Sequence, residues 1–307
     1  MSNEIFWSSV ETDAGRELLK AEILMKLGEP AFIANHPALG MEIDFTGSGA
    51  DTAEIREDDV EQPGVMTTIA ENGSWANSAI DTDRYSVGIA HYYDQVTISD
   101  WTEMLDGEGQ FSPARFARKY ALSEAFTWAD LLATTIATAS AAGPTMAAQP
   151  DLEDLVEAKY LLQAAFAADG PIMGLFHPYQ IRSLKLDAGF DQTNNFAIND
   201  PEVAAIAKAT GSAYVGRYDG IDIFQSWRVT TSGGKYVGGL FTRGGIAKGV
   251  GQFTGSGGYA RAVNLGRIRF VEERDPTGPR RALRGETALG AALFQNARVV
   301  KFQSPTA

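Results

Sequence analysis

Apolar residues recur at three- and four-residue steps most regularly across residues 112–142. This spacing places them on one face of a helix. Ser112 suits the N-cap and Pro113 the first turn, and Gly143-Pro144 ends the pattern. A helix of about 30 residues would be about 45 Å long. We therefore expect a structural strut here.

Other parts of the chain show shorter helical patterns. Leucine, isoleucine and methionine form an amphipathic stripe across residues 14–28, and a second stripe begins near Asp151 and reaches Gly170. A third helix is predicted from Pro201 to about residue 210, and the short segment YQIRSLK is a weaker helical candidate.

Alternation of apolar and polar residues predicts strands in residues 65–69 and 85–98. A polar stretch, ENGSWANSAIDTD, separates them, so together they predict a long two-stranded hairpin with a polar tip. An isolated two-stranded ribbon is marginally stable in water. The hairpin would therefore need a covering surface, which an oligomer supplies.

The segment 30–63 looks irregular and acidic, with small and turn-forming residues around its carboxylates. We interpret it as an extended arm with little core of its own. The acidic run consists of Glu54, Glu57, Asp58, Asp59 and Glu61.

Strands and helices alternate in the second half of the chain, which predicts an α+β or α/β unit around residues 147–260. PIMGLFHP reads as a buried strand, and IDIFQSWRV follows a turn at Asp219-Gly220. Residues 232–258 contain 11 glycines, which we interpret as loops and turns between short strands. RIRFVEE and NARVVKF are further strand candidates, joined by a link that carries Arg280, Arg281 and Arg284.

Charge is divided unevenly along the chain. Residues 1–110 hold 22 acidic and 5 basic residues, whereas residues 111–307 hold 17 acidic and 21 basic ones. A net charge of −13 disfavours direct nucleic-acid binding, which depends on clustered Lys and Arg. The split suits head-to-tail association of copies, although two solvated faces would produce it equally well.

Composition argues against a membrane protein, a secreted protein and any site that depends on cysteine. No stretch approaches the roughly 18 apolar residues of a membrane helix, and the first residues lack the pattern of a secretion signal, so we expect synthesis in the cytoplasm. The absence of cysteine removes disulfides, thiolate nucleophiles and cysteine-ligated zinc.

The sequence contains few of the residue patterns that are typical of an active site. The three histidines, His36, His91 and His177, stand in no catalytic motif and are interpreted as packing or surface residues. The glycine run lacks a P-loop ending, because Gly249 follows Lys248, and it departs from the dinucleotide fingerprint by one residue. The acidic run could hold a divalent cation, but a solvated or partner-facing strip is favoured. We expect no catalytic, cofactor-binding or metal-binding residues and no enzyme.

The order of the elements resembles that of the major capsid proteins of tailed bacteriophages, a fold shared with encapsulins and the herpesvirus capsid floor. FSPARFARKYALSEAFTWADLLATTIATAS resembles the long spine helix of that family. LVEAKYLLQAAFAADGPIMGLFHPYQIRSLK is similar to the helix, strand and short helix of its axial domain, and YVGRYDGIDIFQSWRV to the glycine-containing strand after them. GGKYVGGLFTRGGIAKGVG resembles the apolar strands that follow.

The resemblance implies an α+β fold and a division of the chain. The division comprises an N-terminal arm (1–60), an extended hairpin loop (61–100), a peripheral domain with the spine helix (101–146), an axial domain (147–262), and strands returning to both domains (263–307). It also implies a structural subunit of an icosahedral capsid, which self-assembles into hexamers and pentamers and encloses the DNA genome. The implied location is the virion, with assembly in the host cytoplasm and no membrane.

The resemblance also implies partners: other copies of the chain, a portal and in some members a decoration protein. The family's lysine-dependent crosslink from the hairpin loop is not expected, because residues 65–100 contain no lysine. The arm begins almost at once, so a separate scaffolding protein is expected. The alternatives are an encapsulin-type compartment and, from another class, a soluble hydrolase or nucleotide-binding enzyme.

Contacts between copies should join the acidic arm and hairpin to the basic regions of neighbours. The candidates are Arg267, Arg269, Arg280, Arg281, Arg284, Glu54, Glu57, Asp58, Asp59, Glu61 and Trp75.

Overall fold

A computed structural model describes the backbone of residues 36–39, 41–48, 50–58, 82–99, 113–140, 143, 149–164, 170–186, 214–229, 231–253, 261–265, 268–274 and 280–306. The predicted helices over residues 14–28 and 201–210 lie outside these ranges. The described part is a mixed α+β structure dominated by sheet, which agrees with the predicted fold class.

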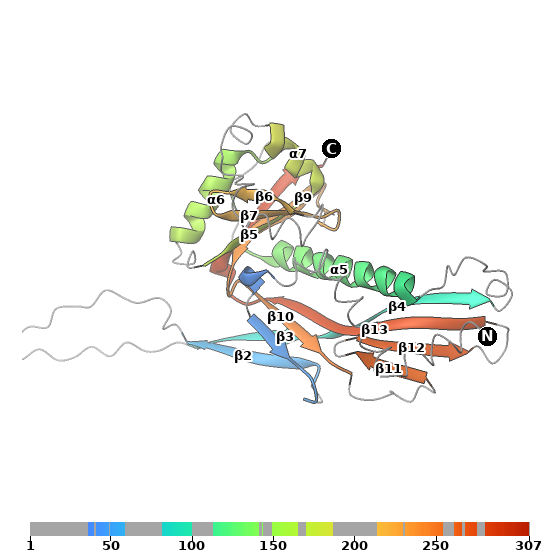
Figure 1. Cartoon of the computed structure of the whole chain (residues 1–307). Coiled ribbons are helices and arrows are strands. Elements are labelled where there is room, and N and C mark those ends of the chain that lie inside the picture. The colour runs from blue at the N-terminus through green and yellow to red at the C-terminus, as the bar shows by residue number, and fades with distance from the viewer. Residues whose placement is uncertain are drawn as a thin grey trace, which may run out of the picture.

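The first sheet has six strands and forms the lower part of the molecule in Figure 1. Its strands are β1 (Met41–Asp44), β4 (Ala90–Ser99), β10 (Ile246–Gly251), β11 (Arg261–Leu265), β12 (Ile268–Arg274) and β13 (Arg280–Leu293). The 14-residue β13 is its centre, because it pairs antiparallel with β4 along one edge and with β12 and then β10 along the other.

The second sheet also has six strands and forms the upper part. Its strands are β5 (Ile172–Phe176), β6 (Tyr214–Tyr218), β7 (Ile221–Gln225), β8 (Thr231–Ser232), β9 (Lys235–Thr242) and β14 (Val299–Pro305). All five residues of the central β5 are buried, as expected for a strand covered on both faces. Two helices, α6 (Leu152–Ala164) and α7 (Pro178–Leu186), cover one face through Leu155, Leu162 and Leu184.

Helix α5 (Pro113–Thr138) packs against both sheets (Figure 1). Its 26 residues correspond to about 39 Å. In its C-terminal half, Leu132 and Ile136 pack in the core against the second sheet, opposite the face that α6 and α7 cover. Trp128, one turn earlier, contacts Val250 and Leu289 of the first sheet. The structure confirms the helix predicted over residues 112–142, with its end at Thr138.

A two-stranded sheet of β2 (Thr52–Asp58) and β3 (Thr82–Gly88) lies on the face of the first sheet opposite α5. Val87 and Tyr85 pack there with Ala247 and Phe294. Gly290 of β13 allows the close approach, because a Cβ atom on it would overlap the carbonyl oxygen of Gly88.

Three expectations were wrong in part. The strand that pairs with residues 82–88 is 52–58 and not 65–69, and residues 90–99 pair with β13 of the same chain, so they are not part of an isolated two-stranded ribbon. The segment 30–63 is not uniformly irregular, because β1 pairs parallel with β10, and the 3-10 turn η1 (Pro37–Leu39) places Ala38 and Leu39 in the core.

The other corrections concern glycine and arginine. The link that carries Arg280, Arg281 and Arg284 is the strand β13. Several glycines of the run lie in buried strands and not in turns. Gly239 in β9 is one example, because a Cβ on it would come within 2.6 Å of Ile136 in α5. The predicted strands at PIMGLFHP, IDIFQSWRV, RIRFVEE and NARVVKF are confirmed.

Candidate assembly surfaces

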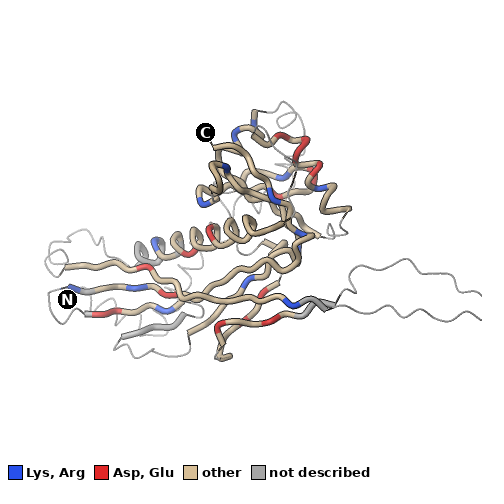
Figure 2. The backbone as a smooth tube through the Cα atoms, turned by 180° about the vertical axis from the view of Figure 1, so that it is seen from behind, with Lys and Arg blue, Asp and Glu red and all other residues tan. Residues whose placement is uncertain are grey.

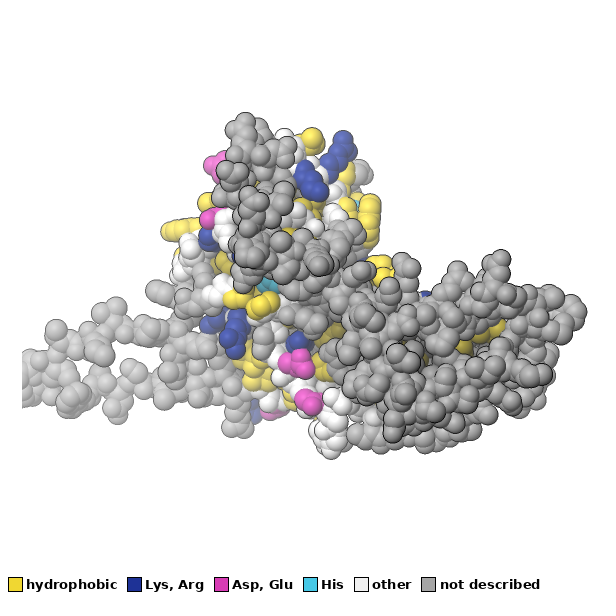
Figure 3. Space-filling model, viewed as in Figure 1, with side chains coloured by type: hydrophobic (Ala, Val, Ile, Leu, Met, Phe, Trp, Pro, Cys, Tyr) yellow, Lys and Arg dark blue, Asp and Glu magenta, His cyan; other side chains and the backbone are white. Residues whose placement is uncertain are grey.

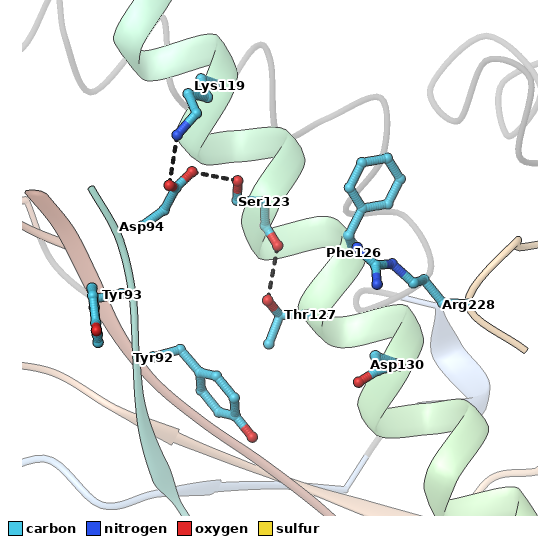
Figure 4. A pocket seen from close by; sticks show the side chains of 9 residues that line it. All are labelled: Tyr92, Tyr93, Asp94, Lys119, Ser123, Phe126, Thr127, Asp130 and Arg228. Atoms are coloured by element: carbon cyan, nitrogen blue, oxygen red, sulfur yellow. Dashed lines mark hydrogen bonds and ion pairs between the residues drawn. The ribbon is translucent and has the colours of Figure 1, made fainter. Parts of the chain in front are cut away.

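A groove of about 460 Å³ runs between β4 and the middle of α5 (Figure 4). Its lining comprises Tyr92, Tyr93, Asp94, Lys119, Ser123, Phe126, Thr127, Asp130 and Arg228. Asp94 on β4 connects the two walls of the groove, because it accepts hydrogen bonds from Lys119 Nζ and Ser123 Oγ of α5, both at 2.6 Å. Burial raises the pKa of Asp94, but these bonds outweigh it and leave the pKa below its usual range.

The rim of the groove exposes large apolar side chains. Phe126 is 50% and Tyr93 66% exposed, and the Arg228 guanidinium lies 5.6 Å from the centre of the Phe126 ring. Exposed aromatics of this size are enriched in contact surfaces. Sequence reasoning missed this groove. The available signal was Leu122 and Phe126, which lie one helical turn apart and off the buried stripe of α5.

The arginines predicted to receive acidic neighbours divide into two groups. Arg269 is buried and donates from Nε to the carboxylate of Glu286 at 2.7 Å, and Glu286 has no exposed surface. Arg284 lies 3.5 Å from the other oxygen of Glu286 and also pairs with Glu273. These two guanidinium groups therefore compensate acids of their own sheet.

The remaining candidates are less engaged or lie outside the described residues. Arg280 is exposed at the start of β13, and Glu54 is exposed in β2. Arg281, Glu57 and Asp58 lie in described strands, but their side chains are outside the described part. Arg267, Asp59, Glu61 and Trp75 lie wholly outside it. Strand β2 and the start of β13 lie at opposite ends of the molecule's lower part, so one copy does not bring the exposed Glu54 and Arg280 together (Figure 1).

A buried polar cluster attaches the N-terminal segment to the second sheet. Asp222 lies 3.1 Å from His36 Nε2 and accepts hydrogen bonds from Arg217 Nε at 2.8 Å and Tyr214 at 3.2 Å. His36 Nδ1 accepts the backbone N–H of Ala38, so Nε2 is the nitrogen that donates to Asp222. Burial raises the pKa of Asp222, but the bonds from His36 and Arg217 prevail and lower it. These bonds join the segment before β1 to β6 and β7, so the cluster has a structural role.

The other chemically notable residues have structural partners. His91 lies 3.6 Å from Glu286, and His177 stacks on Tyr236 with 3.9 Å between ring centres. Lys248 of the glycine run forms an ion pair with Glu42 at 2.7 Å. Within the described ranges, no group of three or more His, Cys, Asp or Glu side chains could hold a metal ion. Of the helices in those ranges, none is both long and apolar enough to cross a membrane.

Comparison with known proteins gives a match in structure only. No protein-family model matches the chain, and no curated protein matches its sequence. The capsid of Ralstonia phage GP4 aligns with a TM-score of 0.59 at 9% identity, covering 89% of this chain and 91% of the other. The head structure of Helicobacter pylori bacteriophage KHP40 aligns with a TM-score of 0.55 at 10% identity, covering 88% of each.

The same fold occurs in a shell of another kind. The SrpI encapsulin complex from Synechococcus elongatus aligns with a TM-score of 0.52 at 10% identity, over 86% of this chain and 85% of the encapsulin chain. The chain therefore has the fold of phage capsid proteins and encapsulins, as the sequence resemblance predicted.

Proposed function

We propose that this protein is the major capsid subunit of a tailed bacteriophage, which assembles into the hexamers and pentamers of an icosahedral shell around the DNA genome. The observation that carries the proposal is the structural match to phage capsids over nearly the whole of both chains. A fold alone does not fix a function. Here the exposed groove and the scarcity of catalytic parts in the described residues support a role in assembly.

In this proposal the second sheet with α6 and α7 is the axial domain, and the first sheet with α5 as spine helix is the peripheral domain. The predicted bounds of the N-terminal arm (1–60) and of the extended hairpin loop (61–100) shift toward the N-terminus in this proposal. The pairing of β2 with β3 supports placing the base of this loop in residues 52–58 and 82–88. Strands β12 and β13 return to the peripheral domain and β14 to the axial domain.

Contacts between copies would use surfaces that one copy leaves exposed. We assign to them Phe126 and Tyr93 at the groove, together with Arg280 and the acidic residues of the hairpin loop. Arg269 and Arg284 are engaged within their own sheet and are assigned to stability. An exposed ion pair contributes about 0–1 kcal/mol, so apolar burial repeated at every contact would supply most of the free energy of assembly.

The expected partners are other copies of the chain, a separate scaffolding protein and a portal; a decoration protein, present in some members of the family, is not assigned to this chain. The location is the virion shell, assembled in the host cytoplasm. The net charge of −13 fits a protein that encloses DNA without gripping it through a basic surface.

Sedimentation velocity and negative-stain microscopy of the purified full chain test the proposal. We expect capsomers or closed shells in the megadalton range. A stable monomer at high protein concentration would overturn it.

The structural match to SrpI supports a second candidate, an encapsulin-type compartment. The contents of the particle separate the two. Particles from infected or induced cells should contain nuclease-protected DNA if the protein is a capsid subunit, whereas an encapsulin-type shell would contain a protein cargo.

A further inference from the structure

The part of the molecule built on the second sheet carries opposite charges on opposite flanks. Figure 2 shows acidic residues along α6 on one side and basic residues near α7 on the other. The space-filling view repeats this division, with apolar side chains visible on both edges (Figure 3). A head-to-tail contact between identical copies needs two different, complementary surfaces on one chain.

The outward stripe of α6 forms the acidic flank. Leu152, Leu155, Ala158 and Leu162 are buried, which turns the other side of the helix to solvent. That outer side carries the exposed Glu153 and Glu157, followed by Val156 at 45% and Tyr160 at 65% exposure. The positive charge of Lys159 does not offset the negative charges of Glu153 and Glu157, because Lys159 forms an ion pair with Asp219 at 2.8 Å.

Helix α7 and the neighbouring strand start form the basic flank. Arg182 and Lys185 are exposed on α7, and Leu186 at its end is 75% exposed. An aromatic group adjoins them, because Tyr179 of α7 contacts the Tyr236 ring and His177 lies between Tyr236 and Trp227. Trp227 is 79% exposed, and Lys235 next to Tyr236 adds a further positive charge.

Both flanks therefore combine charged residues of one sign with exposed large apolar side chains. Single exposed apolar residues are ordinary, but groups of them beside charges mark contact surfaces. The opposite signs set the orientation of the contact, since acidic-to-acidic and basic-to-basic approaches are repulsive. The partner that fits each flank is thus the other flank of a second copy.

We propose that the α6 flank of one copy binds the α7–Trp227 flank of the next, and that this heterologous contact closes the rings of the shell. The inference rests on the proposed function and adds the surfaces and their polarity. Both flanks of every copy are used when such a contact closes into a ring.

Charge reversal tests the contact. We would prepare Glu153→Lys with Glu157→Lys, then Arg182→Glu with Lys185→Glu, and finally all four changes in one chain. Like charges placed in register should raise the critical concentration for assembly about tenfold or more in each two-site variant. The four-site variant restores the complementarity and should assemble near the wild-type concentration. Glu153→Asp with Glu157→Asp keeps the sign and should behave as wild type.

Mixing the two charge-reversal variants gives a sharper readout. In a head-to-tail ring, attractive contacts would then require strict alternation of the variants, and alternation closes only in rings with an even number of copies. The mixture should form hexamers and no pentamers, whereas the four-site variant should form both.

The outcomes separate this inference from the proposed function. A wild-type chain that never assembles overturns both. Wild-type shells together with unaffected two-site variants overturn the inference alone, and so does a loss of assembly that the four-site variant does not restore. Circular dichroism of each variant checks that the fold is retained.

Discussion

The ion pair between Arg269 and Glu286 offers the strongest test of the sheet's internal electrostatics. The Glu286 carboxylate is fully buried and Arg269 is 8% exposed, and the guanidinium also lies 4.1 Å from the centre of the Phe253 ring. Removing one member of such a pair leaves a buried charge, which typically costs about 3–5 kcal/mol. Arg284 at 3.5 Å compensates part of it, so we place Arg269→Met near the lower limit.

Replacing both partners should be far less harmful. Arg269→Met combined with Glu286→Leu removes both charges and fills the site with apolar atoms, an exchange that is often neutral or stabilising. We expect the double variant to recover most of the loss, which gives a coupling free energy of about 2 kcal/mol or more in a double-mutant cycle. Urea unfolding of unassembled protein, followed by tryptophan fluorescence to which the buried Trp128 contributes, measures it.

Two results would refute this reasoning. One is an Arg269→Met variant that loses less than about 1 kcal/mol, which is within the range of an exposed ion pair. The other is an Arg269→Met variant of normal stability that fails to assemble, because Arg269 would then act between copies, as the sequence alone suggested.

Three further predictions concern other parts of the chain. The folded-state pKa of Asp222 is lowered from 3.8, so its stabilising contribution is present above about pH 4 and is lost as the pH falls through the folded pKa. Asp222→Asn should therefore weaken the acid dependence of stability in urea unfolding, and a pH profile identical to that of the wild type would contradict this prediction. Gly285→Ala should lower the free energy of unfolding by about 1–3 kcal/mol through overpacking, because a Cβ atom would overlap the Tyr120 ring. Gly88→Ala is the matched control, because its Cβ would meet the nearest atom at 3.6 Å, and equal melting temperatures of the two variants would argue against the close approach at Gly285. Phe126→Ser should leave the unfolding free energy within about 0.5 kcal/mol of wild type yet reduce assembly seen by sedimentation, and unchanged assembly would remove the groove from the proposed contacts.

The sequence predicted elements whose signals are local. Helix α5 has a long apolar period between helix start and stop signals, and β5 is a short apolar run in which every residue is buried. Strand β13 was missed because its arginines resemble a polar link, and Glu273, the cross-strand partner of Arg284 on β12, becomes its neighbour only when the sheet forms. The four residues of β1 are too few and too acidic to predict a strand without β10 beside them.

The assembly surfaces, too, could be predicted only where the sequence signal is local. The arginine candidates were chosen from their charge, yet burial separates Arg269 from the exposed Arg280, and burial cannot be read from spacing alone. The Asp222 cluster joins His36 to a residue 186 positions away. The one local hint was an aspartate inside the apolar run IDIF.

The order in which the strands occur constrains how the chain can fold during synthesis. It passes from the second sheet to the first between β9 and β10, and back again between β13 and β14. The central strand of one sheet and an edge strand of the other therefore leave the ribosome late, within residues 280–305. Until then β4, β9 and β10 present unsatisfied backbone groups and apolar faces, which favours aggregation of nascent chains. Neither sheet can therefore be completed before residues 280–305 have been synthesised.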